Sequence, residues 1–490
     1  MAEKVIIAGA GIGSAKNLTL AVKEALDEAE VIIYDRLLNS AILEDYQGKK
    51  ELLYVGKKAG NHSMDQEEIS QLMVERARAG KKVVRLKGGD PYIFGRGGEE
   101  VLYLREQGLD FEVLPGLSSG IVCLNTAGFP ATHRDVATSV SFITGHRKKG
   151  VVGTFDQYAK LEGTLVFYMG LNSLEKIVSE LIAGGMSPER PIAIIQNGAY
   201  NSQTTLFSTL EKILEEPELE QMGSPALIVV GEVINLREEM DYFTKRPLFG
   251  VSIGLTRALK QAGTVRDCLE ALGAVTHVIP TIELSPCGDE ELSSAVQENY
   301  SHIVLTSINA VNRFFEAFLA KRDIRDLANS KIAVVGRKTA EAVEKYHLKV
   351  DICPDVYQGE PLIEAIRPTV DEHSKILFPH SAKTRSELIS AMAELGELKE
   401  FAVYENQAPE EVVPLPEQLD YMLFTSSSTV ENFVEIYGKD ALMHSKIISI
   451  GEITSKSIKN LGLELYAQSP EATIDSLIET IKEDVHAQNA

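Results

Sequence analysis

The sequence predicts an α/β protein with several compact lobes, and three features of the chain support this. Its 490 residues correspond to about three or four compact units at roughly 100 to 200 residues per domain. Short apolar runs alternate with helix-length segments from Val5 onward, which is typical of α/β architecture. The second half also contains an internal repeat.

The first half contains nine runs that favour β-strands, separated by segments with helical spacing of apolar residues. The expected strands are Val5–Ala8, Val31–Tyr34, Glu51–Val55, Lys82–Leu86, Phe111–Leu114, Ser139–Thr144, Thr164–Tyr168, Ile192–Gln196 and Ala226–Val230. The charged, proline-containing stretch Asp241–Pro247 interrupts this pattern before a new strand at Val251–Thr256. We therefore expect a boundary between two halves near residue 247.

The repeat lies within residues 300–451. Thr306–Val311 (TSINAV) is similar to Thr425–Val430 (TSSSTV), and Lys331–Gly336 (KIAVVG) is similar to Lys446–Gly451 (KIISIG). The two pairs have nearly equal offsets, which indicates a duplicated α/β unit with too few copies for a solenoid. Ordinary similarity between αβ units is the alternative.

Composition excludes several classes of function. Lys and Arg total 49 against 71 Asp and Glu, and the net charge of −22 opposes non-specific binding to nucleic acid or an anionic membrane. Between residues 57 and 149, however, basic side chains outnumber acidic ones, which suits an anionic small molecule. The four cysteines form no CxxC pair, so we expect no disulfide framework, no thiolate metal site and a cytoplasmic location. We find neither a basic leader nor about 18 consecutive apolar residues.

A glycine-rich loop follows the first expected strand. Gly9, Gly11 and Gly13 would let the backbone approach a ligand at the start of a helix. With Asp35 as a ribose-binding acid, these first forty residues also fit a nicotinamide dehydrogenase, although Ser14 stands where the fingerprint has glycine or alanine. A tight turn without a ligand is the simpler alternative.

The run Val83–Glu100 (VVRLKGGDPYIFGRGGEE) is more informative. An expected strand ends in Gly88, Gly89 and Asp90, and ligands bind at the carboxyl ends of strands in open α/β sheets. Arg96 then adds a cation on a glycine-rich loop. A turn built from proline and glycine is again the alternative.

These motifs resemble uroporphyrinogen III C-methyltransferases over about residues 3–240. The resemblance is carried by Tyr34–Leu38 (YDRLL), Val55–Gly60 (VGKKAG), the Val83–Glu100 run, Val113–Gly116 (VLPG), Ala127–Asp135 (AGFPATHRD), Thr144–His146 (TGH), Thr164–Gly170 (TLVFYMG) and Ser224–Val233 (SPALIVVGEV). It replaces the dehydrogenase interpretation. It implies a two-lobed tetrapyrrole methyltransferase fold over residues 1–245, with lobes of about 1–115 and 116–245 and a homodimer through this half.

The resemblance also implies S-adenosylmethionine as methyl donor, uroporphyrinogen III as acceptor, and precorrin-2 as the dimethylated product. The matching donor positions are Gly9, Gly11, Ile12, Gly88, Gly89, Asp90, Ile93, Ser118, Ser119, Met169, Gly198 and Ala226. Asp35 and Lys57 match the family's proton acceptor and donor. The first loop reads GIGSA where the family has GPGDP, and Leu117–Gly120 (LSSG) replaces a threonine- and alanine-rich run.

Physical reasoning about the same residues gives each a possible role and a simpler alternative. Methyl transfer to a pyrrole carbon depends mainly on positioning, with a carboxylate such as Asp35 or Asp90 helping with charge or proton transfer. Asp35 equally suits a turn acid, and Lys57 a solvated surface lysine. The acceptor has eight carboxylates, for which we expect Arg96, His133 and Arg134 as contacts. We expect His146 to be structural and no metal to be bound.

Residues of about 250–485 resemble uroporphyrinogen III synthases, which implies a two-lobed duplicated α/β synthase fold over 248–490. The matching segments are Leu255–Gly263, Ala271–Leu284, Val304–Phe315, Ile332–Val343, Val403–Asn406, Met422–Phe433 and Ile448–Ile458. One expected lobe joins about 248–283 to 408–485, and the other spans about 284–405. We expect linkers near Ile282–Pro286 and Tyr404–Pro409.

The second resemblance implies cyclisation of hydroxymethylbilane with inversion of its last ring. Tyr404 is the candidate for hydrogen bonding to the departing hydroxyl, and it equally suits a half-buried packing residue. The candidate substrate contacts at strand-to-helix turns facing a cleft are Thr306, Ser307, Thr425, Ser426, Ser427 and Thr454. Each of these could instead cap a helix.

The sequence therefore predicts a bifunctional cytoplasmic enzyme that makes uroporphyrinogen III and then dimethylates it toward sirohaem or cobalamin. A second half without catalysis that only binds a tetrapyrrole is one alternative, and a later precorrin methyltransferase is another. A segment similar to the precorrin-2 dehydrogenase and chelatase module is not found, so we expect a separate partner for those steps.

Overall fold

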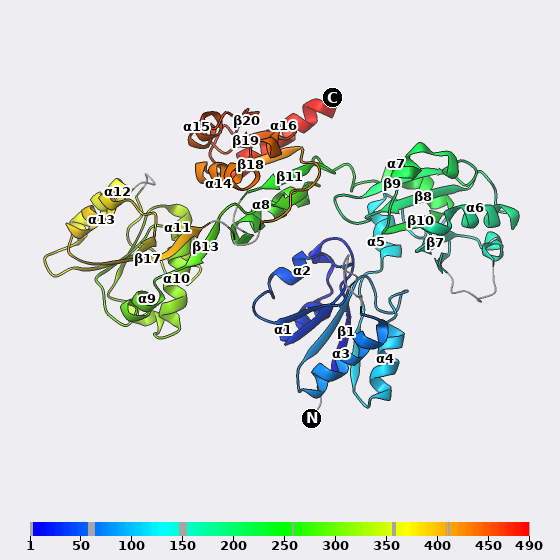
Figure 1. Cartoon of the computed structure of the whole chain (residues 1–490), viewed down its shortest axis with the longest axis horizontal. Helices are drawn as coiled ribbons and strands as arrows, with labels where there is room; N and C mark the ends of the chain where they lie inside the picture. Colours follow the sequence, from blue (N-terminus) through cyan, green and yellow to red (C-terminus); the bar gives the residue numbers. More distant parts are fainter. Residues whose placement is uncertain are drawn as a thin grey trace. The chain divides into compact units, whose positions relative to one another are not determined.

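The computed structural model describes residues 3–56, 64–146, 154–256, 259–354, 359–407, 409 and 412–489. Contacts divide the chain into two compact units, the first built mainly from residues up to Val251 and the second mainly from Ser252 onward. Each unit contains two five-stranded sheets with helices packed on them, as the labels in Figure 1 show. The prediction of an α/β fold is confirmed.

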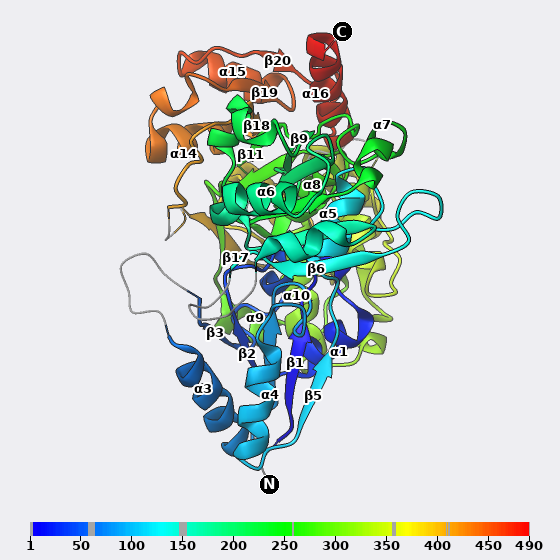
Figure 2. The same cartoon turned by 90° about the vertical axis from the view of Figure 1, so that its right-hand side faces the viewer.

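The first sheet of the first unit is a parallel, doubly wound sheet with the order β3-β2-β4-β1-β5. Its strands are β1 (Val5–Gly9), β2 (Val31–Tyr34), β3 (Glu51–Tyr54), β4 (Val83–Lys87) and β5 (Phe111–Leu114). Buried residues of α3 (Gln66–Arg78) and α4 (Gly97–Glu106) pack on one face, and those of α1 (Leu20–Glu28) and α2 (Ala41–Glu44) pack on the other. Figures 1 and 2 both show α3 beside α4. Because all five strands are parallel, their carboxyl ends meet along one edge.

The second sheet of the first unit is mixed, with the order β6-β7-β10-β8-β9. Its strands are β6 (Val140–Thr144), β7 (Thr164–Tyr168), β8 (Pro191–Gln196), β9 (Thr204–Thr209) and β10 (Ala226–Val230). The helices α5 (Ser119–Thr126) and α6 (Leu174–Ala183) each contribute to a different buried cluster, while α7 (Arg237–Met240) is short.

The second unit also contains two sheets. One has the order β12-β11-β18-β19-β20, from β11 (Ser252–Leu255), β12 (Val275–Val278), β18 (Tyr421–Phe424), β19 (Lys446–Ser449) and β20 (Ala467–Gln468). The other has the order β13-β17-β16-β14-β15, from β13 (Glu283–Pro286), β14 (His302–Leu305), β15 (Lys331–Val334), β16 (Lys375–Ser381) and β17 (Glu397–Gln407). The helices are α8 (Leu259–Ala271), α9 (Asp289–Ala295), α10 (Ile308–Leu319), α11 (Arg337–Glu344), α12 (Gly359–Ile366), α13 (Ser386–Ala393), α14 (Ser427–Tyr437), α15 (Glu452–Asn460) and α16 (Ile474–Asn489).

The two segments expected to be linkers pair with each other. β13 runs antiparallel to the end of β17, with Glu283 opposite Gln407 and Pro286 opposite Tyr404. The two chain crossings thus form a ribbon continuous with the second sheet of this unit. Backbone hydrogen bonds along the ribbon satisfy groups that an isolated linker would leave to water.

The repeat in the sequence has a structural counterpart. β14 pairs in parallel with β15, starting at His302 opposite Lys331, and β18 pairs in parallel with β19, starting at Tyr421 opposite Lys446. α10 and α14 follow the first strand of each pair, and α11 and α15 follow the second. Similar sequences therefore fold into the same βαβα arrangement in both sheets.

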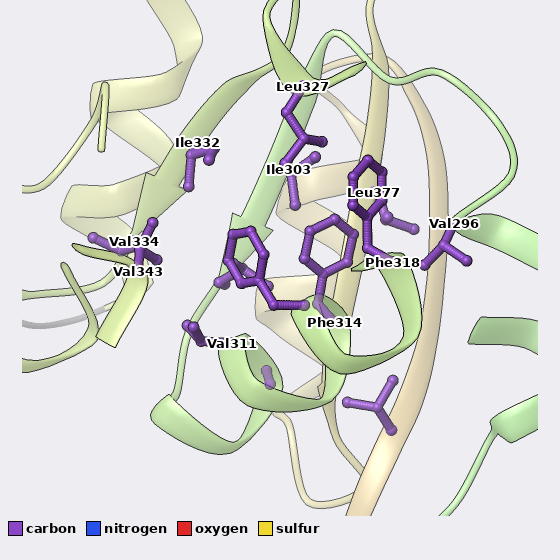
Figure 3. Packing of buried hydrophobic residues seen from close by; sticks show 14 of the residues in the cluster. Val296, Ile303, Val311, Phe314, Phe318, Leu327, Ile332, Val334, Val343 and Leu377 are labelled. Carbon is purple, nitrogen blue, oxygen red and sulfur yellow. The ribbon is translucent and has the colours of Figure 1, made fainter. Parts of the chain in front are cut away.

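An aromatic cluster fills one face of the sheet that contains β14. Phe314, Phe315 and Phe318 of α10 are at most 2% exposed, and the rings of Phe314 and Phe318 stack with their centroids 5.5 Å apart. Figure 3 shows Phe314 and Phe318 directed toward Ile303 and Leu377 of the sheet. This face of α10 packs in the core, and the packing holds the first turn of α10 at the carboxyl end of β14.

Within the residues that the structure describes, no helix combines the length and apolar character needed to cross a bilayer.

Candidate functional site

Glycines bring three strand ends of the first unit into backbone contact. A Cβ atom on Gly9, at the end of β1, would lie 2.5 Å from the backbone nitrogen of Gly116, which follows β5. A Cβ on Gly116 would lie 2.2 Å from the carbonyl oxygen of Gly89, which follows β4. Gly11 and Gly89 exchange backbone hydrogen bonds of 3.2 and 2.8 Å. Only residues without a side chain permit this junction.

The space beside the junction is open. Gly89 has a φ of +70°, and a Cβ placed on it would meet no protein atom within 4 Å. Gly88 faces inward instead, since its Cβ would lie 2.8 Å from the carbonyl oxygen of Leu37. A ligand can thus approach the backbone at Gly89, as expected for a donor contact at the carboxyl edge of a parallel sheet.

Asp90 bridges the loops that follow β4 and β5. One carboxylate oxygen accepts a hydrogen bond from the Tyr92 backbone at 2.9 Å, and the other accepts one from the Gly116 backbone at 3.2 Å. Both oxygens therefore hold the shape of the junction, in addition to the expected role in donor binding.

Loops from the two sheets of the first unit meet at this edge. Ile12 and Ile93 are half-buried and pack against the cluster formed by α5, β7, β8 and β10. A Cβ on Gly13 would lie 2.4 Å from the carbonyl oxygen of Ala199, and one on Gly198 would lie 2.4 Å from Cys123 Sγ. The altered GIGSA loop thus supplies an apolar contact through Ile12 and a close approach through Gly13.

Unusual backbone conformations cluster in the same loops. Of the six non-glycine residues with positive φ in the described part of the chain, Phe94, Arg96, Met169, Asn197 and Ala199 lie here, at φ of 49–67°. Such conformations are costly for residues with a side chain and concentrate at functional sites. The sequence prediction missed Phe94, Asn197 and Ala199, and the only signal for the last two was the NGA segment after β8.

Tyr168 fastens the start of α5 to the end of β7. Its hydroxyl oxygen accepts a hydrogen bond from the Gly120 backbone at 2.7 Å and lies 2.7 Å from Ser118 Oγ. Burial raises the pKa of Tyr168, so the phenol stays protonated at neutral pH. Ser118 is buried, Ser119 is half-buried, and Met169, the residue after Tyr168, is 55% exposed. Three expected donor contacts are thus arranged around one tyrosine that the sequence analysis did not single out.

Asp35 lies just beyond β2 at the same edge. One oxygen of its carboxylate lies 3.1 Å from the Arg85 guanidinium, and the other accepts a hydrogen bond from the Leu37 backbone at 3.3 Å. Its side chain is 28% exposed, which leaves the group accessible. Lys57, the expected proton donor, lies outside the described residues.

The expected substrate contacts of the first unit have different surroundings. Arg96 is exposed and pairs with Glu99, and this hydrogen bond raises its pKa further. His133 is half-buried and its Nδ1 accepts a hydrogen bond from the Asp135 backbone at 3.3 Å, while Arg134 is exposed. His146 is also exposed. Ala226, an expected donor contact, is half-buried at the start of β10, opposite Gln196.

In the second unit, Tyr404 and Ser307 are in contact. The Tyr404 hydroxyl donates a hydrogen bond to Ser307 Oγ at 3.0 Å, and this oxygen also accepts one from the Ala310 backbone at 3.1 Å. Ser307 is therefore the N-cap of α10, and Tyr404 also packs against the aromatic cluster. The contact between the two hydroxyl groups therefore joins β17 to the start of α10.

The repeat places a second serine in the same position. Ser426 caps α14 by accepting a hydrogen bond from the Thr429 backbone at 3.4 Å, and Ser427 Oγ donates to the Ile453 carbonyl at 3.3 Å. Thr306 and Thr425 are half-buried at the ends of β14 and β18. Thr454 differs from the expectation, because it lies in the first turn of α15 and is only 4% exposed.

A metal centre receives no support from the side chains in the described ranges, since no group of three or more His, Cys, Asp and Glu is placed to bind one.

Two family models match the chain, one in each half. The model for tetrapyrrole (corrin/porphyrin) methylases matches residues 4–214, and the model for uroporphyrinogen-III synthase HemD matches residues 264–479. The first match supports S-adenosylmethionine as the methyl donor of the first unit.

Individual relatives show the same division. The porphyrin biosynthesis protein HemD of Ruminiclostridium josui is 36% identical over 98% of this chain and 97% of its own length. A siroheme synthase of Escherichia coli strain K12 / DH10B is 44% identical over 49% of this chain, and the chain spans only 52% of that protein. The crystal structure of uroporphyrin-III C-methyl transferase from Thermus thermophilus complexed with S-adenyl homocysteine is 37% identical, covers 48% of this chain and 100% of its own, and has a TM-score of 0.42.

Because the relative from Ruminiclostridium josui matches both halves and each half matches its own family model, the chain belongs to the family of porphyrin biosynthesis enzymes that join a tetrapyrrole methylase to a uroporphyrinogen III synthase.

Proposed function

We propose that the first unit transfers two methyl groups from S-adenosylmethionine to uroporphyrinogen III, giving precorrin-2, and that the second unit cyclises hydroxymethylbilane to uroporphyrinogen III. The observation that carries the first part is the glycine junction with Asp35 at the same sheet edge, in a unit that matches the methylases. The second part is supported by the synthase match and the Tyr404–Ser307 contact.

Positioning does most of the work in the methyl transfer. A pyrrole carbon is already electron-rich, so holding it in line with the donor's methyl group contributes more than acid or base strength. The alkylated carbon becomes quaternary and the macrocycle is left cationic, so Asp35 then accepts the proton that the macrocycle must lose at another position. Its hydrogen bonds to Arg85 and Leu37 keep one carboxylate orientation, and its partial exposure leaves the group open to substrate.

The surface next to the junction suits a macrocycle with charged edges. Large apolar side chains that are at least 40% exposed gather in its loops, namely Leu37, Tyr92, Phe94, Leu117 and Met169. Arg96 and Arg134 add exposed cations in the part of the chain where basic residues are in excess. Apolar contacts for the ring and guanidinium groups for the carboxylates are the complementary chemistry of uroporphyrinogen III.

In the synthase reaction, hydroxymethylbilane must lose its hydroxyl as water and then close through a spiro intermediate at its last ring. Tyr404 lies on β17. When its hydroxyl releases the hydrogen bond to Ser307, that hydroxyl can donate to the departing group instead. We further propose a homodimer through the first unit, donor contacts at the twelve expected positions, and a separate protein that oxidises precorrin-2 and inserts the metal.

Product identity tests both parts separately. Purified full-length chain with uroporphyrinogen III and S-adenosylmethionine should give a product heavier by two methyl groups, and hydroxymethylbilane should give isomer III without the donor. A singly methylated product, or methylation only of an already methylated tetrapyrrole, would contradict the first part. Isomer I alone would leave the second unit as a binding module.

The Tyr168→Phe variant tests the donor pocket. Removing the hydroxyl leaves the buried Gly120 N–H without its acceptor, which lowers the stability of the fold by about 1–3 kcal/mol. We expect S-adenosylhomocysteine to bind about tenfold more weakly in isothermal titration calorimetry, because Ser118 and Ser119 lose their anchor. Tyr242→Phe, a change in a 61% exposed tyrosine of the same unit, is the control. Equal affinity in both variants would show that Tyr168 does not shape the pocket.

The Tyr404→Phe variant tests the second unit. We expect the rate of isomer III formation to fall by about tenfold, as for loss of one positioned proton donor, with methyl transfer unchanged. Tyr437→Phe is the matched control, because its hydroxyl also donates a single hydrogen bond, to the Val413 carbonyl at 2.8 Å. If both variants form isomer III at the rate of the unchanged chain, Tyr404 is a packing residue.

A further inference from the structure

A cluster of charged side chains is buried under the first sheet, behind Asp35. Arg85 and Lys87 lie two residues apart on β4, so both point to the face covered by α3 and α4. Their side chains are 3% and 5% exposed, and Glu100 of α4, which lies between them, is completely buried. Glu100 Oε1 is 3.3 Å from Arg85 Nε and 2.9 Å from Lys87 Nζ.

This arrangement is unfavourable as a purely structural element. Burying three charges costs a large desolvation energy, and apolar side chains of similar size often stabilise such a position better. Glu100 Oε2 is buried and makes no hydrogen bond in the described structure. Burial, and next the nearby charge of Arg85, lower the pKa of Lys87. A buried cluster of charged side chains that lowers stability in this way is expected at a site where the function of the protein depends on it.

The Arg85 guanidinium carries the connection to Asp35. Nε faces Glu100, Nη1 donates to the carbonyls of Ile33 and Leu86 at 3.3 and 3.0 Å, and Nη2 donates to the Asp35 carboxylate at 3.1 Å. Every nitrogen of the planar group is thus engaged. Its orientation is fixed by Glu100 on one edge and by two backbone carbonyls on another, so Asp35 receives a donor with a defined direction.

Glu100 also reaches the neighbouring helix. Gln66, the first residue of α3, donates a hydrogen bond from Nε2 to Glu100 Oε1 at 2.9 Å. One carboxylate oxygen therefore receives hydrogen bonds from β4 and from α3. Glu100 Oε1 therefore links β4, whose Arg85 contacts Asp35, to the start of α3.

We propose that Glu100 is a positioning residue for methyl transfer, which acts by orienting Arg85 so that Arg85 holds the Asp35 carboxylate toward the substrate. The inference rests on the proposed role of Asp35 in the first unit. Glu100 touches neither donor nor substrate. Its effect must therefore appear in the rate of the chemical step rather than in donor affinity.

The test compares Glu100→Gln, Asp35→Asn and the double variant in the full-length chain. We expect Glu100→Gln to lower kcat for methyl transfer by about tenfold. The affinity for S-adenosylhomocysteine and the KM for uroporphyrinogen III should both change by less than about twofold. In the Asp35→Asn background, Glu100→Gln should cause no further loss, since its effect passes through Asp35. Glu51→Gln is the control, because it changes an exposed carboxylate of β3 in the same sheet, one that pairs with Arg76 of α3.

The outcomes separate the possible failures. If Asp35→Asn leaves kcat unchanged, the proposed role of Asp35 fails. Two results would contradict the positioning role of Glu100. One is a lowered kcat in Asp35→Asn that falls further, by the full factor of Glu100→Gln, in the double variant. The other is an unchanged kcat in Glu100→Gln alone. If Glu100→Gln lowers both the affinity for S-adenosylhomocysteine and kcat, the role of Glu100 is purely structural. Should Glu100→Gln not fold, Glu100→Asp retains the charge but withdraws it from Arg85, and it must show the same selective loss of kcat.

Discussion

Replacing Asp35 by Asn is expected to lower kcat for methyl transfer by about 10²–10⁴, the range for loss of a positioned general base. The amide keeps the shape of the carboxylate but cannot accept the proton that the alkylated macrocycle loses. It also loses the charged hydrogen bond to Arg85 at 3.1 Å. The assay is transfer of methyl groups to uroporphyrinogen III under anaerobic conditions, with initial rates measured at saturating donor.

Asp45→Asn is the matched control for this prediction, because Asp45 is an exposed aspartate just after α2 in the same lobe. We expect it to retain the full rate. An Asp35→Asn variant within about threefold of the unchanged chain would show that Asp35 is a turn residue and that positioning alone supports the reaction.

Replacing Gly116 by Ala is expected to remove donor binding. The added Cβ would lie 2.2 Å from the Gly89 carbonyl oxygen and 2.6 Å from the carbonyl carbon of Gly9, and neither backbone can move without opening the junction. Overpacking of this kind costs about 1–3 kcal/mol in stability. Because the shift displaces the backbone at Gly89, we expect at least about a hundredfold weaker binding of S-adenosylhomocysteine, equivalent to about 2.7 kcal/mol.

Gly98→Ala is the control, since a Cβ on Gly98 meets no atom within 4 Å and alanine favours the α4 helix. It should leave affinity unchanged. Formation of isomer III by the second unit reports on the rest of the chain in the same preparation. Full donor affinity in Gly116→Ala would contradict the assignment of the glycine junction as the donor site.

The positions of the strands could be predicted from the sequence wherever a strand contains a clear apolar run. Four strands have the predicted bounds in the structure, and the other five predicted strands of the first half differ by one residue at one or both ends. The four are Val31–Tyr34, Phe111–Leu114, Thr164–Tyr168 and Ala226–Val230. β9 (Thr204–Thr209) was missed, because an edge strand that carries three threonines and a serine among six residues has no apolar run. It forms an antiparallel hairpin with β8 at the edge of a sheet in which β10 is also antiparallel to β7 and β8.

The hydrogen bonds of the site could not be predicted in the same way, because they join residues that are far apart in the sequence. Asp90 was visible in the GGDP segment, but its hydrogen bond to Gly116 spans 26 residues. Tyr168 lies 48 residues from Gly120, and Arg85 lies 50 residues from Asp35. Helix caps were easier, since Ser307 and Ser426 bond to a backbone only three residues away. Thr454 shows the limit of that pattern, because it lies within the first turn of α15 and the N-cap is Gly451.

The most direct test of the account is a coupled reaction. Purified full-length chain is incubated anaerobically with enzymatically generated hydroxymethylbilane, with and without S-adenosylmethionine, and the products are analysed by mass spectrometry and isomer-resolving chromatography. We predict isomer III without the donor, and the same macrocycle carrying two additional methyl groups with it. Isomer I as the only product, unmethylated in the presence of donor, would contradict the proposal that one chain makes uroporphyrinogen III and then methylates it.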